Sequence, residues 1–254
     1  MSSAEITPKQ RRIPACQNRQ GKTFGHMSVI ALDGPAGSGK STVAGMLAER
    51  IGFLHADSGA IYRTITLASI RRLGAGQSPD EFGNLFQKSN LDPDSLGIQV
   101  VVSDGKQSNC IENQDVGLDI RTPEVTGRIR YIADSIPCRN TVNRLLREFA
   151  QQTGLVADGR DMGTVVFPDT PSKFFLEASV QVRAKRRFEE MLGQGNSSQT
   201  LAEIEQDIAR RDEEDRNRAV GALRKADDAI LIDTSELSRE DVLSRILAHI
   251  QFRF

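Results

Sequence analysis

The stretch VIALDGPAGSGKST, residues 29–42, joins an apolar run to an aspartate, a glycine-rich turn, a lysine and two hydroxyl side chains. Residues 29–32 predict a short buried strand, and Val43, Met46 and Leu47 begin the apolar face of a helix. The turn therefore lies between a strand and a helix N-terminus, where free amide groups and the helix dipole favour an anion. The stretch predicts a phosphate-binding loop.

The pattern Gly34-x-x-x-x-Gly39-Lys40-Ser41 matches the P-loop of nucleotide-binding proteins. Lys40 is placed to reach the terminal phosphates of a nucleoside triphosphate, and Ser41 to bind the magnesium that accompanies it. An ordinary glycine-rich turn is the alternative, which the full motif in this context disfavours. The residues expected to bind ATP here are Gly34, Gly37, Ser38, Gly39, Lys40, Ser41 and Thr42.

The composition favours a globular protein with local anion binding. The chain has 254 residues, with 38% apolar and 26% charged side chains and a net charge of −1. No global field points to nucleic acid or to an anionic membrane, and no apolar run approaches the roughly 20 residues of a membrane helix. Cys16, Cys110 and Cys138 contain no CxxC pair, so neither a disulfide framework nor a zinc site is indicated. We expect a cytoplasmic monomer whose partners are small-molecule nucleotides, with no nucleic acid and no membrane among them.

Residues 1–26 are polar, mildly basic and aperiodic, and we expect a flexible leader there. A small basic interaction patch is the alternative, and Met27 is an alternative start. A single catalytic domain is expected over residues 27–254. The N-terminus also lacks the apolar core of a signal peptide.

From Val29 onward, strand-like apolar runs alternate with helical patterns, which is typical of an α/β fold with a parallel sheet. Further strands are expected in GFLHADSG, GLVADGRD, SKFFLEAS and DAILIDTS, each ending near an aspartate or a small polar residue. Ligands of such sheets gather at the carboxyl ends of the strands. Between about residues 77 and 121, GIQVVVSDGKQSNCIENQDV alternates like a hairpin that turns at Asp104-Gly105, which predicts a small β insertion.

Arginines placed near the expected strand ends distinguish two kinds of phosphoryl acceptor. An alcohol acceptor needs a residue to take its proton, whereas a phosphate acceptor needs cations that bring two anions together. Ser58 is expected to cap a helix directly after a strand, with Arg63 in the next turn. Arg160 and Asp161 lie in the turn after another strand. These cations favour a phosphate acceptor.

A second set of charges lies in IARRDEEDRNR, where Arg211, Asp215 and Arg218 fall at i, i+4 and i+7 on one helical face. Such a stripe can grip a phosphate and a sugar hydroxyl together. For a charged helix alone, a solvated face of ion pairs is the favoured interpretation, whereas beside a P-loop and an arginine at two other strand ends the two interpretations are equally good. In VRAKRRFEEM, Arg183 and Arg187 form a basic helix before a loop-like segment, which predicts a mobile lid at about 185–200 or a plain surface helix.

Five motifs in this order, DGPAGSGKST, DSGAIYR, IRTPEV, DGRDMGTVVFPD and RDEEDRNR, closely resemble those of bacterial cytidylate (CMP) kinases, which are P-loop nucleoside monophosphate kinases. The resemblance covers about residues 28 to 250, and the last two motifs are far more specific than the P-loop. It implies a P-loop NTPase-type parallel sheet flanked by helices, with a small β insertion in the monophosphate-binding region and a short lid. It also implies that ATP with Mg2+ phosphorylates CMP or dCMP to the diphosphate.

The resemblance implies roles for individual residues. Ser58, Arg139 and Asp161 would contact the cytosine, while Arg63 and Arg160 would hold the acceptor phosphate. Arg211, Asp215 and Arg218 would meet the sugar and phosphate of the acceptor, and Arg183 and Arg187 would serve ATP. The catalytic cations would be Lys40, Arg160 and Arg187.

Simpler roles stand beside these assignments. Ser58 as a helix cap, Asp161 as a turn residue and Asp215 as the ion-pair partner of Arg211 are the structural alternatives. For Asp33 and Asp158, water-mediated magnesium binding competes with a structural role in a turn.

The sequence departs from the family pattern at Arg130, where a small hydroxyl is usual, at Cys138, where valine is usual, and at Leu146, where glutamine is expected. These departures leave open a related kinase with altered base choice, such as one that prefers UMP. A GTPase-type switch is disfavoured because no Asn-Lys-x-Asp is present. A kinase of small alcohols is disfavoured by the number of arginines on the acceptor side.

Overall fold

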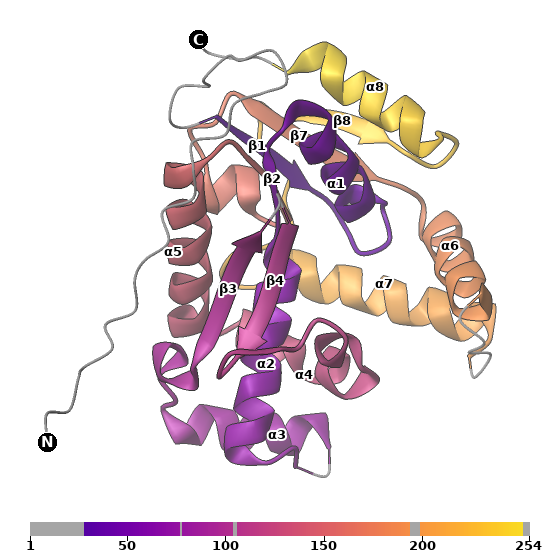
Figure 1. Ribbon diagram of the computed structural model, residues 1–254. Helices are drawn as coiled ribbons and strands as arrows, with labels where there is room; N and C mark the ends of the chain where they lie inside the picture. Colours follow the sequence, from indigo (N-terminus) through magenta and orange to yellow (C-terminus); the bar gives the residue numbers. More distant parts are fainter. Residues whose placement is uncertain (1–27, 77, 104–105, 194–198, 251–254) are drawn as a thin grey trace, which may run out of the picture.

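The computed structural model (Figure 1) describes residues 28–76, 78–103, 106–193 and 199–250, so the predicted leader at 1–26 lies outside the described residues. A parallel five-stranded sheet, in the order β2-β6-β1-β7-β8, forms the centre of the fold. The strands are β1 (Val29–Asp33), β2 (Leu54–Asp57), β6 (Leu155–Gly159), β7 (Ser172–Glu177) and β8 (Ile230–Asp233). All five expected strands are confirmed.

The register of the sheet aligns polar residues at the carboxyl ends of its strands. Asp57 of β2 pairs with Asp158 of β6, and Asp33 of β1 pairs with Gly159. Strand β1 is buried on both faces, as expected of a parallel sheet covered by helices. Three aspartates therefore lie on adjacent strands at the edge where ligands of such sheets bind.

Helices cover both faces of the sheet. On one face, α1 (Lys40–Ile51) and α8 (Arg239–His249) pack against Ile30 and Leu32 of β1. On the other face, α2 (Ser58–Leu73) and α5 (Ile136–Gln152) pack against a core that includes Val29 and Ala31. Alternate residues of β1 thus serve the two cores, which follows from the two-residue period of a strand.

The predicted β insertion is confirmed as a small antiparallel sheet, in the order β3-β4-β5. Its strands are β3 (Ile98–Ser103), β4 (Lys106–Ile111) and β5 (Gln114–Asp115), and the predicted turn at Asp104-Gly105 lies outside the described residues. The β pattern did not predict α3 (Pro79–Ser89), which begins with a capping box between Ser78 and Glu81. Two 3-10 turns, η1 (Pro93–Leu96) and η2 (Asp119–Arg121), and α4 (Pro123–Ala133) complete this region.

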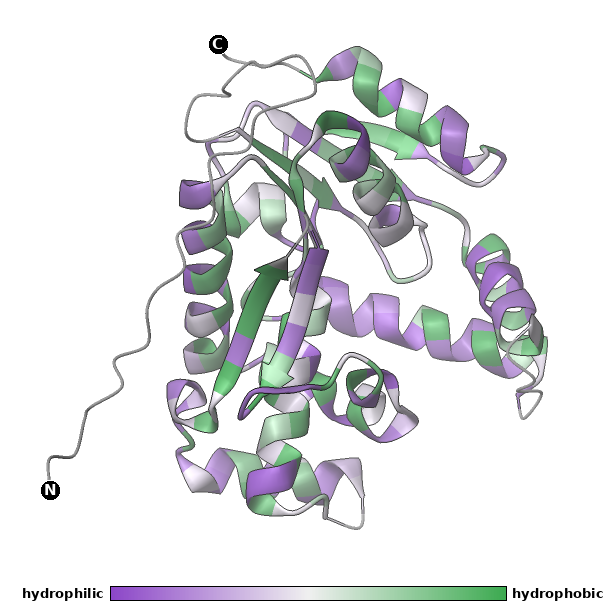
Figure 2. Ribbon diagram, in the orientation of Figure 1, coloured by the Kyte–Doolittle hydropathy of each residue, from purple (hydrophilic) through white to green (hydrophobic). Residues whose placement is uncertain are grey.

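Two further helices, α6 (Val180–Gly193) and α7 (Leu201–Asn217), pack against each other beside the central sheet (Figure 1). The predicted lid at about 185–200 spans the second half of α6, and its residues 194–198 lie outside the described part of the chain. Figure 2 shows that α7 is hydrophilic along much of its length, whereas hydrophobic residues concentrate in the central strands. Among the described helices, none has the length and apolar character needed to cross a membrane.

Candidate active site

The P-loop closes tightly against the neighbouring strand. Gly34 has φ 154°, and a Cβ atom at this position would lie 2.0 Å from the carbonyl oxygen of Leu176. Any side chain there would therefore collide with β7, which explains why glycine begins the loop. Gly39 precedes α1, and within the described ranges no side chain caps this helix. The amide groups of its first turn thus face the loop without a competing side-chain acceptor.

The ammonium group of Lys40 is enclosed by this loop. Its Nζ donates a hydrogen bond to the carbonyl oxygen of Pro35 at 3.0 Å, and the residue is 6% exposed. Burial lowers the pKa of Lys40 to about 7, and the positive charge of Arg160 adds to this effect. A nearby phosphate would favour the charged form, so the loop suits a polyanion.

A hydroxyl and a carboxylate lie side by side at the start of α1. Ser41 donates its Oγ hydrogen to Asp158 Oδ2 at 2.5 Å, and His55 Nε2 lies 2.6 Å from Asp158 Oδ1. Burial by itself would raise the pKa of Asp158, but its hydrogen bonds with His55 and Ser41 and the charge of Lys40 hold the pKa below its ordinary value. The carboxylate is therefore ionised.

These two groups fit a magnesium ion. Mg2+ prefers oxygen ligands and retains several waters, and a hydroxyl with an ionised carboxylate offers the donor set that P-loop proteins use. The described residues contain no cluster of three His, Cys, Asp or Glu side chains that could hold a metal by themselves. A divalent ion at Ser41 would therefore share its coordination with phosphate and water.

Asp33 takes the structural alternative that the sequence left open. Its Oδ1 accepts from the amide of Met162 and its Oδ2 from the amide of Gly163, both at 2.8 Å. These amides begin the π-helical turn η3 (Met162–Val166) directly after the Arg160-Asp161 turn. Asp33 is 4% exposed, and burial raises its pKa to about 6. The side chain thus holds the backbone that carries Arg160 and Asp161.

On the acceptor side, Asp215 joins two arginines. Arg160 Nε donates to Asp215 Oδ2 at 2.7 Å, and Arg218 Nη2 lies 3.1 Å from Asp215 Oδ1. Arg160 and Arg218 are thus its ion-pair partners, while the charge of Arg211 adds to the attraction. The predicted single helical face also needs correction, because α7 ends at Asn217 and Arg218 lies just beyond it, in non-helical backbone. Arg218 reaches back three residues to Asp215, and its Nε donates to Asp134 Oδ1, at the end of α4, at 2.7 Å.

Two further guanidinium groups, those of Arg63 and Arg211, lie in the same region. Arg63 Nη1 donates to Thr126 Oγ1 at 2.7 Å, a partner that the sequence did not indicate. Burial lowers the pKa of Arg63 to about 10, with repulsion from Arg211 and Arg187 adding to it. Burial also lowers the pKa of Arg211, followed by repulsion from Arg160. Positive charges gathered in this way indicate an anion-binding site, since an anion among them offsets their repulsion.

The predicted base-contacting residues Arg139 and Asp161 form a buried ion pair. Arg139 Nη2 donates to Asp161 Oδ2, and both side chains are 4% exposed. Burial raises the pKa of Asp161, although the charge of Arg139 opposes the shift. The Arg139 guanidinium carbon lies 5.8 Å from the ring centroid of Tyr62. The pair therefore presents a charged donor and a charged acceptor beside an aromatic ring.

Two polar atoms at this pair are buried without a hydrogen-bond partner among the described residues, namely Arg139 Nε and Tyr62 Oη. Buried polar groups are nearly always satisfied, so unsatisfied ones beside an ion pair indicate a polar ligand. Sequence reasoning missed Tyr62. The signal was present, because Tyr62 follows Ser58 at i+4 and the two residues share a helical face.

Ser58 does not cap α2, which corrects the prediction. Asp57 is the cap, and its Oδ1 accepts from the amide of Ala60 at 3.0 Å. The backbone is extended at Asp57 and helical from Ser58 onward, so only Asp57 has the conformation that a cap requires. The Ser58 hydroxyl donates to the carbonyl oxygen of Asp158 at 2.8 Å, which leaves its lone pairs to accept from another donor.

The two arginines of α6 differ in their surroundings. Arg183 is 2% exposed and donates to both carboxylate oxygens of Asp212, at 3.0 and 2.5 Å. It also donates to the carbonyl oxygens of Ala178 and Ala36, at 2.9 and 3.0 Å. Its guanidinium thus ties α6 and α7 to the P-loop backbone, and the expected ATP contact stays a prediction. The Arg187 side chain is 57% exposed and pairs with Glu190 of its own helix at 3.2 Å.

The departures from the family pattern lie mostly in the core. Cys138 and Leu146 are both 0% exposed and pack in the core between α5 and the sheet. Arg130 Nη2 donates to Asp80 Oδ1 and to the Tyr131 hydroxyl, each at 2.6 Å. Leu146 therefore acts as a packing residue, and Arg130 bonds to α3.

A family model and the relatives of this chain among known proteins carry the same description. A family model described as Cytidylate kinase matches residues 30–252. A cytidylate kinase of Actinobacillus succinogenes is 42% identical over 227 residues, which cover 88% of this chain and 98% of that protein. One of Halalkalibacterium halodurans is 43% identical over 224 residues, covering 88% and 97%. Cytidylate kinase 1 of Haemophilus influenzae is 41% identical over 234 residues, covering 89% and 96%.

Proposed function

This chain belongs to the cytidylate kinase family, and we propose that its P-loop holds ATP while the guanidinium groups on the acceptor side hold the phosphate of CMP or dCMP. The reaction is phosphoryl transfer from ATP to CMP or dCMP, which gives ADP and CDP or dCDP and belongs to pyrimidine nucleotide metabolism. The observation that carries the assignment of the acceptor site is the convergence of Arg160 and Arg211 on Asp215, with Arg63 beside Arg211.

On the donor side, the amides of the P-loop and the first turn of α1 bind the β- and γ-phosphates of ATP, and Lys40 reaches the terminal phosphates. The enclosed position of its ammonium group supports this role. Ser41 and Asp158 would hold Mg2+ with its waters, and their adjacent oxygens support the assignment. A magnesium ion held there would supply charge neutralisation for the triphosphate.

On the acceptor side, Arg63, Arg160 and Arg211 bind the phosphate of CMP and oppose the repulsion between the two anions. The acceptor oxygen is already ionised, so no residue is needed to remove a proton. Asp215 orients the guanidinium of Arg160 and accepts from a sugar hydroxyl, and Arg218 supports it from the other side. These residues place the acceptor oxygen in line with the γ-phosphate.

The Arg139–Asp161 pair reads the base. Cytosine carries an amino group at C4, which donates to a carboxylate, whereas uracil carries an oxygen there that a carboxylate repels. Arg139 donates to the acceptor atoms of the ring, and Ser58 and Tyr62 line the same site. The two unsatisfied polar atoms, Arg139 Nε and Tyr62 Oη, support this assignment within the described part of the chain.

A lid formed by residues 185–200 closes over the triphosphate, and Arg187 then neutralises the transferring phosphoryl group and helps to exclude water. The exposed position of Arg187, on a helix that packs with α7, supports this motion. The chain acts as a monomer in this proposal. Light scattering coupled to size-exclusion chromatography tests that state.

The experiment that tests the function measures ADP production from ATP and Mg2+ with CMP, dCMP, UMP, AMP and GMP supplied one at a time. A blank without acceptor is the control. Turnover with CMP or dCMP and a silent blank is expected. Turnover that favours UMP would overturn the base assignment, and hydrolysis without an acceptor would overturn the assignment of the acceptor site.

A further inference from the structure

The α7–β8 loop, residues 218–229, passes directly against the base-reading pair. Gly221 in this loop is buried and has φ +66°. A Cβ atom at Gly221 would lie 1.7 Å from Arg139 Nη2 and 2.6 Å from Asp161 Oδ2. The glycine backbone is therefore in contact with the pair itself, and no side chain fits between them.

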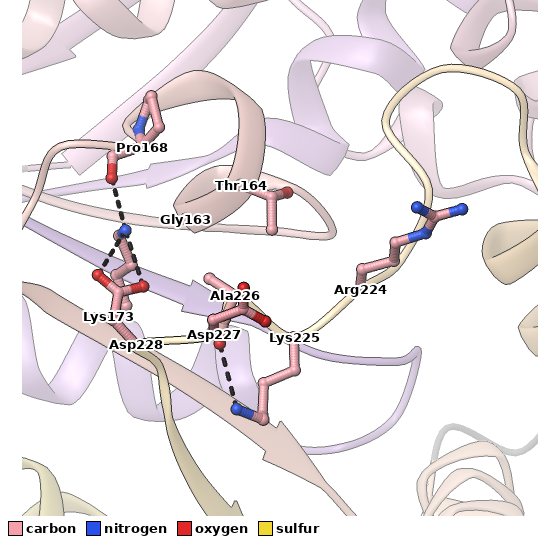
Figure 3. Close-up of a pocket in the computed structure, with 9 residues that line it drawn as sticks. All are labelled: Gly163, Thr164, Pro168, Lys173, Arg224, Lys225, Ala226, Asp227 and Asp228. Carbon is pink, nitrogen blue, oxygen red and sulfur yellow. Dashed lines mark hydrogen bonds and ion pairs between the residues drawn. The ribbon is translucent and has the colours of Figure 1, made fainter.

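The loop cannot easily withdraw from this contact, because it is held on both sides of Gly221. Before it, Arg218 Nε donates to Asp134 Oδ1 at 2.7 Å. Just after it, the Leu223 amide donates to the carbonyl oxygen of Asp215 at 2.8 Å, and Leu223 is 5% exposed. Beyond it, Lys173 Nζ donates to Asp228 at 2.8 and 2.9 Å and also bonds to Pro168, as Figure 3 shows. Lys173 is 6% exposed and lines, with Asp228, a cavity of about 460 Å³.

The Arg139 guanidinium is also restricted on its other sides. Its Nη1 donates to the carbonyl oxygen of Ala133 at 3.1 Å, and the ring of Tyr62 lies beneath it. A side chain at position 221 would therefore push the guanidinium away from Asp161 rather than into free space. Breaking that pair would change both groups that face the base.

We propose that Gly221 is a positioning residue for base recognition, whose backbone holds the Arg139 guanidinium against Asp161. This inference rests on the proposed function, which places the cytosine at that pair. A displaced guanidinium no longer aligns Asp161 with the amino group of cytosine. The discrimination between cytosine and uracil depends on that alignment, because the two rings differ at the atom that meets the carboxylate.

The test compares Gly221→Ala with Gly52→Ala. Gly52 has φ +75°, and a Cβ atom there would meet nothing within 4 Å, so this control carries the backbone strain without the collision. For Gly221→Ala we expect CMP affinity, measured by calorimetry, to fall about tenfold or more. The ratio of kcat/KM for CMP over UMP falls by a similar factor, while the KM for ATP stays within about twofold. Gly52→Ala leaves the ratio unchanged. An unchanged ratio in Gly221→Ala would overturn the inference.

A double-mutant cycle with Arg139→Ala separates this inference from the proposed function. If Arg139→Ala does not weaken CMP binding, the proposed base site itself is wrong. If Arg139→Ala weakens CMP binding and Gly221→Ala has its effect only when Arg139 is present, both are supported. An equal effect of Gly221→Ala in the two backgrounds would overturn the role of Gly221 alone.

Folding of the variants provides the remaining control. If Gly221→Ala does not accumulate as folded protein, the collision with Arg139 is the expected cause. The double variant Arg139→Ala/Gly221→Ala, in which the colliding guanidinium is gone, is then expected to fold with a melting temperature near that of Arg139→Ala. Its failure to fold would show that the strain arises elsewhere and would overturn the inference.

Discussion

Arg160 and Asp215, which are 55 residues apart in the sequence, meet through a hydrogen bond of 2.7 Å from Nε to Oδ2. This bond joins the carboxyl end of β6 to α7. Asp215 also contacts Arg218, so one carboxylate orients two guanidinium groups at the proposed acceptor site. The positions of Arg160 and Arg218 thus depend on α7, a helix that packs against α6.

Replacing Asp215 tests this relationship. Asp215→Ala is expected to weaken CMP binding about tenfold or more, because hydrogen bonds to charged groups contribute about 1.5–3 kcal/mol. The KM for ATP should stay within about twofold. Asp207→Ala is the matched control, since Asp207 is a carboxylate on the same helix whose ion pair with Arg210 is exposed. Equal CMP affinity in the two variants would mean that the helix carries only solvated ion pairs.

The pKa of Asp215 predicts how this contribution depends on pH. Burial alone would raise it, but attraction to Arg160 and Arg218 outweighs burial and places the pKa below its ordinary value of 3.8. The ionised form therefore stabilises the fold fully above 3.8, and the stabilisation is lost as pH falls through the lower folded value.

Urea unfolding of the wild-type protein and of Asp215→Asn at a series of pH values checks this dependence. The difference in unfolding free energy is expected to be constant between about pH 5 and 8 and to shrink only below about pH 4. A difference that already declines near neutral pH would contradict the lowered pKa.

The buried pair of Arg183 and Asp212 predicts a large stability effect. Asp212→Ala leaves a guanidinium that is 2% exposed without its counter-ion, and such a loss costs about 3–5 kcal/mol. Asp207→Ala, which breaks an exposed pair, is expected to change stability by less than about 0.5 kcal/mol. Chemical unfolding of both variants gives the comparison. A similar small change in each would show that Arg183 finds another partner or water.

For Arg187, in contrast to the buried Arg183–Asp212 pair, we expect a large effect on catalysis and a small effect on stability. Because its ion pair with Glu190 is exposed, Arg187→Ala should leave the melting temperature almost unchanged. If Arg187 neutralises the transferring phosphoryl group, kcat should fall about 100-fold or more while the KM for CMP changes little. Arg210→Ala on the neighbouring helix removes a similarly exposed arginine and is the control. Equal kcat values in the two variants would remove Arg187 from the catalytic residues.

Asp33 is predicted to act through the backbone. In Asp33→Asn the amide NH2 group would face one of the two amides that the carboxylate now accepts, so the unfolding free energy should fall by about 1–3 kcal/mol. Asp92→Asn, at an exposed carboxylate that accepts from the amide of Asp94, is the control. A fully stable Asp33→Asn protein would show that the turn at Met162 does not need this side chain.

Much of the fold could be predicted from local pattern. The five parallel strands were recognisable as short apolar runs with polar ends, and the antiparallel insertion from its alternation. The start of α2 was misjudged because Asp57 and Ser58 are both good caps, and only the backbone conformation decides between them. The helix α3 was missed because the β pattern that follows it dominated the interpretation of the insertion.

For the candidate site, residue types were predictable and many of their partners were not. The motifs indicated Arg183 and Asp215 as functional residues. Nothing in the sequence showed that Arg183 is enclosed by Asp212, or that Asp215 bonds to Arg160. Gly221 belongs to none of the five motifs, and only its contact with Arg139 in the folded chain indicates a role for it.

The sequence by itself determined the P-loop, because the conformation of a glycine-rich turn before a helix depends on neighbouring residues. It also determined the alternation of strands and helices, since each apolar pattern has its own period. Only the tertiary structure decided the strand order β2-β6-β1-β7-β8, which sets Asp158 of β6 within reach of Ser41 and His55. Ion pairs and loop contacts between distant segments depend on how the layers pack, and that packing is a property of the whole chain.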